Sequence, residues 1–439
     1  MLPTKIRGNA EITLMLTRRG RKYRDFRARH RQNDGMRDIA APQERRRFVG
    51  IDLARFIAIV GMMSAHLLSG LAADPNAMLV GRLLNVAEIL FVASTAATTF
   101  AVLGGVSLVL LTRSMRGAPA WRIYISICIR GVAIALIGWG LMQLNSPISV
   151  VLPYFGIAMI IAATALWLPS WVIGAIAAVL WVFGAAVNAR VRAGLAAIPV
   201  DTTPSIPEQI ARSARDLLLT GHYPAITWVA YMLTGILLAR LLLRARRDGT
   251  LRRVTLWLWV AGLAVFLFLT AIGRVARYRP AWFGLPTGLD DQVLAGARGA
   301  PPGTDLWMLL MPSAHSGSPA DMLRTVAGAC FLIGLLVMLF DAGRPRGGFV
   351  LEAIRCAGAA PLTIYSAHVI ATAAVSHWRT QQFIEGHPVS PDLPLWNFVI
   401  QVACVLAIGA VLAMLRRRGP LEALLGLVSG SSRIKRRTG

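Results

Sequence analysis

Apolar segments of about 20 residues recur along most of the chain between positions 50 and 415, with polar stretches between them. A helix that crosses a membrane needs ~20 such residues, and its backbone must pair internally because lipid offers no hydrogen bonds. The pattern predicts an all-α polytopic membrane protein with about ten transmembrane helices in one bundle. The expected spans are 50–72, 87–112, 122–144, 150–167, 170–188, 222–240, 254–272, 321–340, 357–375 and 395–415.

Polar, basic segments flank this apolar region and predict three parts. Residues 1–47 are expected to form a disordered cytoplasmic tail, residues 48–416 the ten-helix membrane domain, and residues 417–439 a second basic cytoplasmic tail. The first part has no apolar core followed by a cleavage site, so it does not read as a signal peptide. Translation starting at Met1, Met15 or Met36 would leave the predicted spans unchanged.

The charge pattern fixes the expected orientation. The 439 residues are 56% hydrophobic, and 46 Lys and Arg against 21 Asp and Glu give a formal net charge of +25. Such a charge suits nucleic acid, but 33 of the 46 basic residues lie in the tails and in the loops of one predicted side, against 10 in the opposite loops. Basic residues of this kind mark the cytoplasmic side. The sequence therefore predicts a protein of the bacterial inner membrane with both termini on the cytoplasmic side. Its expected partner is the lipid bilayer and not nucleic acid.

Several familiar chemistries have no motif in this chain. The four cysteines stand singly, without a CxxC pair, and no HExxH appears, so we expect neither a disulfide framework nor a bound metal. There is no P-loop for ATP and no GxSxG elbow of a serine hydrolase. Any active site must therefore be built from isolated polar residues within or beside the spans.

The first span carries the clearest such residues. Asp52, Arg55 and His66 interrupt an otherwise apolar helix. At ~100° per residue, His66 falls about 20° from Arg55 and about 40° from Asp52, so all three share one stripe, with Arg55 roughly 16 Å from His66 along the axis. Ionisable groups inside a span are costly and suggest function. The alternative is an interfacial Asp52–Arg55 pair, with His66 reaching the far headgroups.

Further polar residues gather in the predicted outer half of the bundle: His66, Glu88, His222, His315, Asp321, Arg324 and His368. They can supply a general base and an orienting carboxylate, or they can be interfacial residues without a shared site. His368 lies deep in its span, with Tyr365 on the same face. A polar pair at that depth must find partners, which favours a pocket there.

Two parts of the sequence resemble known membrane families. The run RRRFVGIDLARFIAIVGMMSAH (45–66) resembles the opening of the heparan-α-glucosaminide N-acetyltransferase-like family. The segments HSGSPADMLRTVAGA (315–329), PLTIYSAH (361–368) and RRGPLEALL (417–425) resemble a related bacterial group of unknown function (DUF418). Phe56 stands where the first family usually has Gly, and His66 where it has Asn. The loop 73–86 has no His, whereas the eukaryotic enzymes carry one there that takes part in acetyl transfer.

The resemblance implies an enzyme that moves an acyl group, in this family acetyl, from cytoplasmic acyl-CoA to an extracytoplasmic envelope glycan or glycolipid. Our leading hypothesis makes His66 the general base or polarising group and Glu88 or His368 the group that orients it. Asp52 with Arg55 would line the entry for the phosphorylated donor. Tyr365, His222, His315 and Arg324 would contact the acceptor. A transporter or flippase of an envelope lipid, or an inactive scaffold, would use the same polar residues without chemistry, and a homo-oligomer is open in each case.

Overall fold

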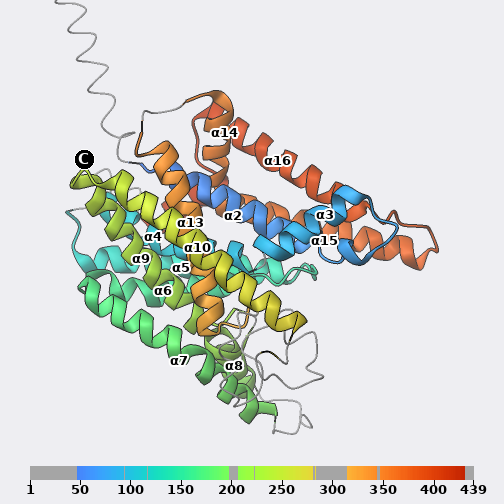
Figure 1. The fold of residues 1–439 in the computed structure, drawn as a ribbon, viewed down its shortest axis with the longest axis horizontal. Coiled ribbons are helices and arrows are strands. Elements are labelled where there is room, and N and C mark those ends of the chain that lie inside the picture. Colours follow the sequence, from blue (N-terminus) through green and yellow to red (C-terminus); the bar gives the residue numbers. More distant parts are fainter. Residues whose placement is uncertain are drawn as a thin grey trace, which may run out of the picture. The chain divides into compact units, whose positions relative to one another are not determined.

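A computed structural model describes residues 47–92, 94–115, 117–196, 206–221, 223–279, 282, 314–343 and 347–430 (Figure 1). Helices are the only regular elements in these ranges, and no strand occurs in them. Eight helices are long and apolar enough to cross a membrane: α2 (Val49–Leu67), α4 (Thr95–Ser114), α5 (Ala120–Met142), α7 (Ser170–Ala196), α9 (Ala225–Arg247), α10 (Leu251–Tyr278), α13 (Pro319–Phe340) and α16 (Leu393–Leu415). The predicted all-helical, multi-span class is confirmed.

The two other predicted spans have a different form. The segment expected at 357–375 is a pair of helices, α14 (Phe349–Gly358) and α15 (Pro361–Ile384), which meet at 79° and can count as one broken span. Pro361 cannot continue the preceding helix, which explains a break just before it. The segment expected at 150–167 is the shorter α6 (Leu152–Ala163), extended by the 3-10 turn η4 (Thr164–Trp167).

The second predicted span, 87–112, begins later than the hydropathy pattern suggested. The 3-10 turn η2 (Leu71–Ala73) leads into α3 (Leu79–Ala87), and a π-helical turn, η3 (Glu88–Val92), follows. At Ser94 the backbone is left-handed, with φ of 60°, and α4 starts at the next residue. A left-handed residue breaks the regular helix, so the apolar residues on either side belong to different helices.

Helix α2 packs against α4, α13 and α14, and also contacts α15 and α16 (Figure 1). Glycines allow the backbones to come close. A Cβ added at Gly358 of α14 would lie 1.9 Å from the carbonyl oxygen of Asp52, and one at Gly50 would lie 2.5 Å from the backbone of Leu336. Small residues at helix contacts are typical of membrane bundles. They place α14 directly against the charged end of α2.

Distant carboxylates cap the N-termini of the two helices that carry His66 and His368. Asp341, just after α13, accepts hydrogen bonds of 2.8 Å from the backbone N–H groups of Val49 and Gly50 at the start of α2. Glu422 accepts hydrogen bonds from Leu362 N–H, at 2.7 Å, and from the hydroxyl of Thr363, at 2.6 Å, at the start of α15. Both carboxylates accept hydrogen bonds from N-terminal N–H groups that have no partner within the helix. Their negative charge also interacts favourably with the positive end of the helix dipole.

Glu422 belongs to α17 (Pro420–Val428), a helix within the segment predicted as a basic tail at 417–439. Two further elements, α8 (Ile206–Arg215) and the π-turn η5 (Asp216–Thr220), lie in the polar region between α7 and α9. Residues 1–46 and 431–439 lie outside the described residues. The two tails and the cytoplasmic location of both termini therefore remain predictions.

Candidate active site

The first polar group at α2, here called the Arg55 cluster, consists of Asp52, Arg55, Ser107, Glu352 and Arg355. Arg55 donates from Nη1 to Asp52 Oδ1 at 2.5 Å and from Nη2 to Ser107 Oγ, on α4, at 2.9 Å. Asp52 is only 2% exposed. The predicted i,i+3 pair therefore forms within α2, and Ser107 holds the other arm of the guanidinium.

A second arginine joins the same carboxylate. Arg355 of α14 lies with Nη1 3.6 Å from Asp52 Oδ2 and is also paired with Glu352. The sequence did not reveal Arg355 as part of this cluster, because its contact depends on how α14 docks beside α2. Two planar guanidiniums side by side are suited to phosphate groups, which arginine can bind in bidentate fashion. The arrangement can hold an anionic donor or serve as a compensated ion-pair network.

The second polar group, here called the histidine chain, consists of His66, His368, Gln401, Thr372 and Asn397. Nδ1 of His66 lies 3.1 Å from Nε2 of His368, and the two rings are nearly parallel, 9° apart. Nδ1 of His368 lies 2.6 Å from Oε1 of Gln401, on α16. The two histidines that the sequence singled out thus meet in one hydrogen-bonded chain inside the membrane domain.

Gln401 is held in turn by its neighbours. Its Nε2 lies 2.8 Å from Asn397 Oδ1 and 3.2 Å from Thr372 Oγ1. Neither Gln401 nor Asn397 was proposed from the sequence. The available signal was their i,i+4 spacing, which puts two amides on one face of an apolar helix. Two such groups inside a span need partners, as the charged residues do.

Glu88 begins the π-helical turn η3, and its hydrogen-bond partner lies outside the histidine chain. Its Oε2 accepts a hydrogen bond of 3.3 Å from Asn85 Nδ2, while Asn85 Oδ1 accepts one of 3.0 Å from the N–H of Ala72. Burial raises the pKa of Glu88 to about 6, and the Asn85 hydrogen bond opposes that shift. The group that contacts His66 is His368, so the orienting role foreseen for Glu88 remains a prediction.

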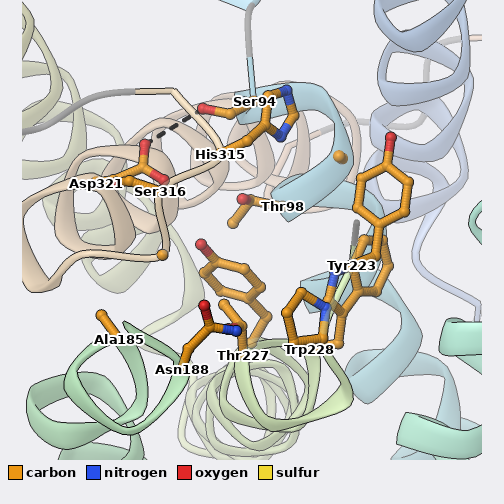
Figure 2. Close-up of a pocket in the computed structure, with 14 residues that line it drawn as sticks. Ser94, Thr98, Ala185, Asn188, Tyr223, Thr227, Trp228, His315, Ser316 and Asp321 are labelled. Atoms are coloured by element: carbon orange, nitrogen blue, oxygen red, sulfur yellow. Dashed lines mark hydrogen bonds between the residues drawn. The ribbon is translucent and has the colours of Figure 1, made fainter. Parts of the chain in front are cut away.

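A small cavity of about 40 Å³ lies among α4, α7, α9 and the start of α13 (Figure 2). Its polar and aromatic lining includes Ser94, Thr98, Asn188, Tyr223, Trp228, Tyr231, His315 and Asp321. Asp321 Oδ1 accepts from Arg324 Nη2 at 3.0 Å, and the same Nη2 lies 2.7 Å from Ser94 Oγ. The left-handed turn at Ser94 therefore brings the start of α4 to this ion pair.

Asn188 gives this cavity an unused acceptor. It is 2% exposed, and its Oδ1 has no hydrogen-bond partner in the part of the chain that the structure describes. In Figure 2 its side chain points into the cavity opposite Thr98. A buried acceptor without a donor is costly, so a water or a ligand donor is expected there. No role for Asn188 was predicted, because in the sequence it lies at the polar end of the fifth span.

His315 stands at this cavity beside Tyr223, with ring centroids 6.4 Å apart. Desolvation of the imidazole lowers the pKa of His315; the charge of Asp321 opposes this shift and that of Arg324 adds to it. Because the residue is exposed to solvent, water limits this effect.

Two other predicted acceptor contacts have different positions. The hydroxyl of Tyr365 accepts a hydrogen bond of 3.2 Å from the backbone N–H of Val151, so this buried ring fastens α15 to the start of α6. His222 lies outside the described residues. Among those residues no group of three or more His, Cys, Asp or Glu side chains is arranged to hold a metal ion.

Comparison with known proteins finds a family similarity in one part of the chain. Residues 47–255 match the model of the family described as heparan-alpha-glucosaminide N-acetyltransferase, catalytic, which confirms the resemblance over this stretch. That family is acetyl-CoA-dependent. The match includes α2 with Arg55 and His66, whereas His315, Arg324 and His368 lie beyond it. No curated protein matches this chain. The resemblance of the later segments to the bacterial group remains a prediction.

Proposed function

We propose that this chain, whose residues 47–255 match the catalytic domain of an acetyl-CoA-dependent N-acetyltransferase family, is a membrane-bound acyltransferase. Its donor is acyl-CoA, with acetyl as the group transferred, bound from the cytoplasm. Its acceptor is an amine or hydroxyl of a cell-envelope glycan or glycolipid on the opposite side of a bacterial inner membrane. The arginine bias of the loops supports this orientation.

One observation carries the proposal: the hydrogen bond of 3.1 Å between His66 and His368. An imidazole that only reaches the headgroups needs no second imidazole as a fixed partner. A base that must take a proton from an acceptor near neutral pH does need its ring held in one orientation. The contact joins α2, within the matched region, to α15, outside it.

In the proposed step the acceptor nitrogen or oxygen attacks the thioester carbonyl carbon of acetyl-CoA. A new N–C or O–C bond forms, and the C–S bond breaks, so CoA leaves as a thiolate. His66 takes the proton that the acceptor loses and passes it to the thiolate, which leaves as free CoA thiol. His368 orients His66 and stabilises the imidazolium that forms during the transfer.

The Arg55 cluster supplies the donor site in this proposal. Arg55 lies roughly 16 Å from His66 along α2, so phosphates bound at Arg55 would place an extended thioester arm along the helix toward His66. Arg355 adds a second guanidinium, 3.6 Å from the shared carboxylate of Asp52. An incoming phosphate would take over hydrogen bonds that Asp52 and Glu352 now accept.

The cavity beside His315 supplies the acceptor contacts. Its aromatic rings and its acceptors, with Asn188 Oδ1 unpaired among the described residues, suit a group that donates hydrogen bonds, such as a hydroxyl or amine. Arg324 donates a hydrogen bond to Asp321 and so fixes the position of its carboxylate. A volume of about 40 Å³ admits one such functional group and not a whole sugar ring.

A turnover assay tests the proposal. The purified protein in lipid nanodiscs receives acetyl-CoA with either glucosamine or an extract of envelope lipids, and the release of CoA thiol and the acetylated product are measured. We expect thiol release that depends on the acceptor. His377→Ala, at an exposed position of α15, should keep it. If acetyl-CoA binds but is not consumed in the presence of either acceptor, a transporter or an inactive scaffold becomes the better account of the protein.

A further inference from the structure

Gln401 occupies an unusual place for a polar side chain. It is 6% exposed, in the middle of the apolar helix α16, and all its polar atoms face other side chains of the histidine chain. The amide has two different ends: Nε2 only donates hydrogen bonds, and Oε1 only accepts them. Its orientation therefore decides where the protons of its neighbours lie.

The contacts of Nε2 set that orientation. Nε2 donates to Asn397 Oδ1 at 2.8 Å and to Thr372 Oγ1 at 3.2 Å, which uses both of its hydrogens. Oε1 then faces Nδ1 of His368 at 2.6 Å. Because Oε1 can only accept, Nδ1 of His368 must carry the proton.

The same logic continues to His66. A neutral imidazole carries one proton, so His368 with a protonated Nδ1 presents Nε2 as an acceptor. That acceptor lies 3.1 Å from Nδ1 of His66, which must donate to it. Nε2 of His66 is then left with its lone pair, and it makes no hydrogen bond within the described ranges.

The geometry points to Gln401 as a positioning residue that fixes the tautomers of His368 and His66, so that His66 presents an unprotonated Nε2. On the proposed function, on which this role rests, the consequence is that His66 acts as a base and not as a polarising donor. The opposite set of hydrogen-bond directions would put the proton of His66 on Nε2. It would require the side-chain amides of Gln401 and Asn397 both to flip, and the Thr372 hydroxyl to donate to Gln401.

Nitrogen-15 NMR of histidine-labelled protein in nanodiscs at pH 7.5 reads the tautomers directly. The signals are assigned by their loss in His66→Ala and His368→Ala. In the wild type we expect both rings protonated at Nδ1 and bare at Nε2. A protonated Nε2 on His66 would overturn the inference. This readout needs no turnover, so its failure and the failure of the proposed function can be told apart.

Substitutions at Gln401 test the cause. Gln401→Met removes the acceptor, and both rings should shift toward mixed tautomers, with transfer lowered by up to about 10²-fold, the lower end of what acid–base catalysis supplies. Gln381→Met, at an exposed site on α15, is the matched control and should change neither. Unchanged tautomers in folded Gln401→Met would contradict the assignment.

Gln401→Glu keeps the inference testable if the methionine variant fails to fold. Glutamate can only accept at this position, so it should hold the wild-type tautomers and make His66 more basic through the chain. The lower limb of the pH–rate profile should move to higher pH. A reversed His66 tautomer, or an unmoved profile, would show that Gln401 only fills space.

Discussion

At one end of α2 the carboxylate of Asp52 is shared by the guanidiniums of Arg55 and Arg355, whereas at the other end His66 hydrogen-bonds to a second imidazole. The first end is a network of full charges that compensate one another. The second is a chain of groups that are each neutral when unprotonated, and it leaves one ring nitrogen of His66 without a partner among the described residues. Both ends sit in one apolar helix.

The difference separates two tasks. Removing one member of a buried charge network leaves the others uncompensated, so mutations at Asp52 should act first on folding. Removing a member of a neutral chain costs less stability, so mutations at His66 should act first on chemistry. The following variants break or sharpen this contrast.

Asp52→Ala should have the largest effect on stability. It strands Arg55 and Arg355 without their shared carboxylate, and we expect a loss of about 3 kcal/mol or more. Thermal unfolding in detergent and the yield of monodisperse protein measure it. Asp248→Ala breaks only the exposed pair with Arg244 and should cost less than about 1 kcal/mol. Equal losses in the two variants would remove the special status of the Arg55 cluster.

Arg55→Lys should weaken the donor site while the protein stays folded. Lysine keeps a charge near Asp52 but loses the planar fork that also binds Ser107. We expect acetyl-CoA to bind about tenfold more weakly, a change of about 1.4 kcal/mol, by isothermal titration calorimetry. Wild-type affinity in this variant, together with misfolding of Arg55→Ala, would make the arginine purely structural.

The cap at Asp341 predicts a pH effect on α2. Burial raises the pKa of Asp341 to about 6, from an ordinary value of 3.8, although its backbone hydrogen bonds oppose the shift. Because the folded protein holds the proton of Asp341 more tightly than the unfolded chain does, this carboxyl contributes to the free energy of unfolding. The contribution is fully present below pH 3.8, the ordinary pKa, and is lost as pH rises through about 6. The unfolding temperature of wild type relative to Asp341→Asn should therefore fall between pH 4 and pH 7. A difference that grows over this range contradicts the assignment.

His315→Ala should have the smallest effect. The residue borders the cavity and is exposed, so its loss should raise the acceptor KM a few-fold and leave donor affinity unchanged. Turnover at varied glucosamine or lipid acceptor measures this. A changed acetyl-CoA affinity instead would place the donor, and not the acceptor, at this cavity.

Hydropathy and helical spacing predicted much of this molecule because they are local properties. The spans follow from runs of apolar residues, and the Asp52–Arg55 pair follows from its i,i+3 spacing. The break between α14 and α15 did not follow from hydropathy, although Pro361 was a local signal for it. The late start of α4 had no such signal, because the left-handed backbone of Ser94 is not evident from a serine in an apolar run.

The contacts between distant helices lay beyond the sequence. His66 and His368 were each selected as polar residues too deep for the interface, but their contact depends on how α15 docks beside α2. Arg355 and Gln401 were missed for the same reason, because each acquires its role from a partner on another helix. A single arginine or glutamine in a helix gives no sign of that partner.

The central claim is that chemistry belongs to the His66 end of α2 and donor binding to the Arg55 end. Measuring acetyl transfer and acetyl-CoA affinity on one preparation of His66→Ala tests it most directly, with His377→Ala as the matched control. We predict wild-type affinity and a smaller loss of thermal stability than in Asp52→Ala, with transfer lowered by about 10²- to 10⁴-fold, the usual contribution of a general base. Full transfer by His66→Ala would contradict the account.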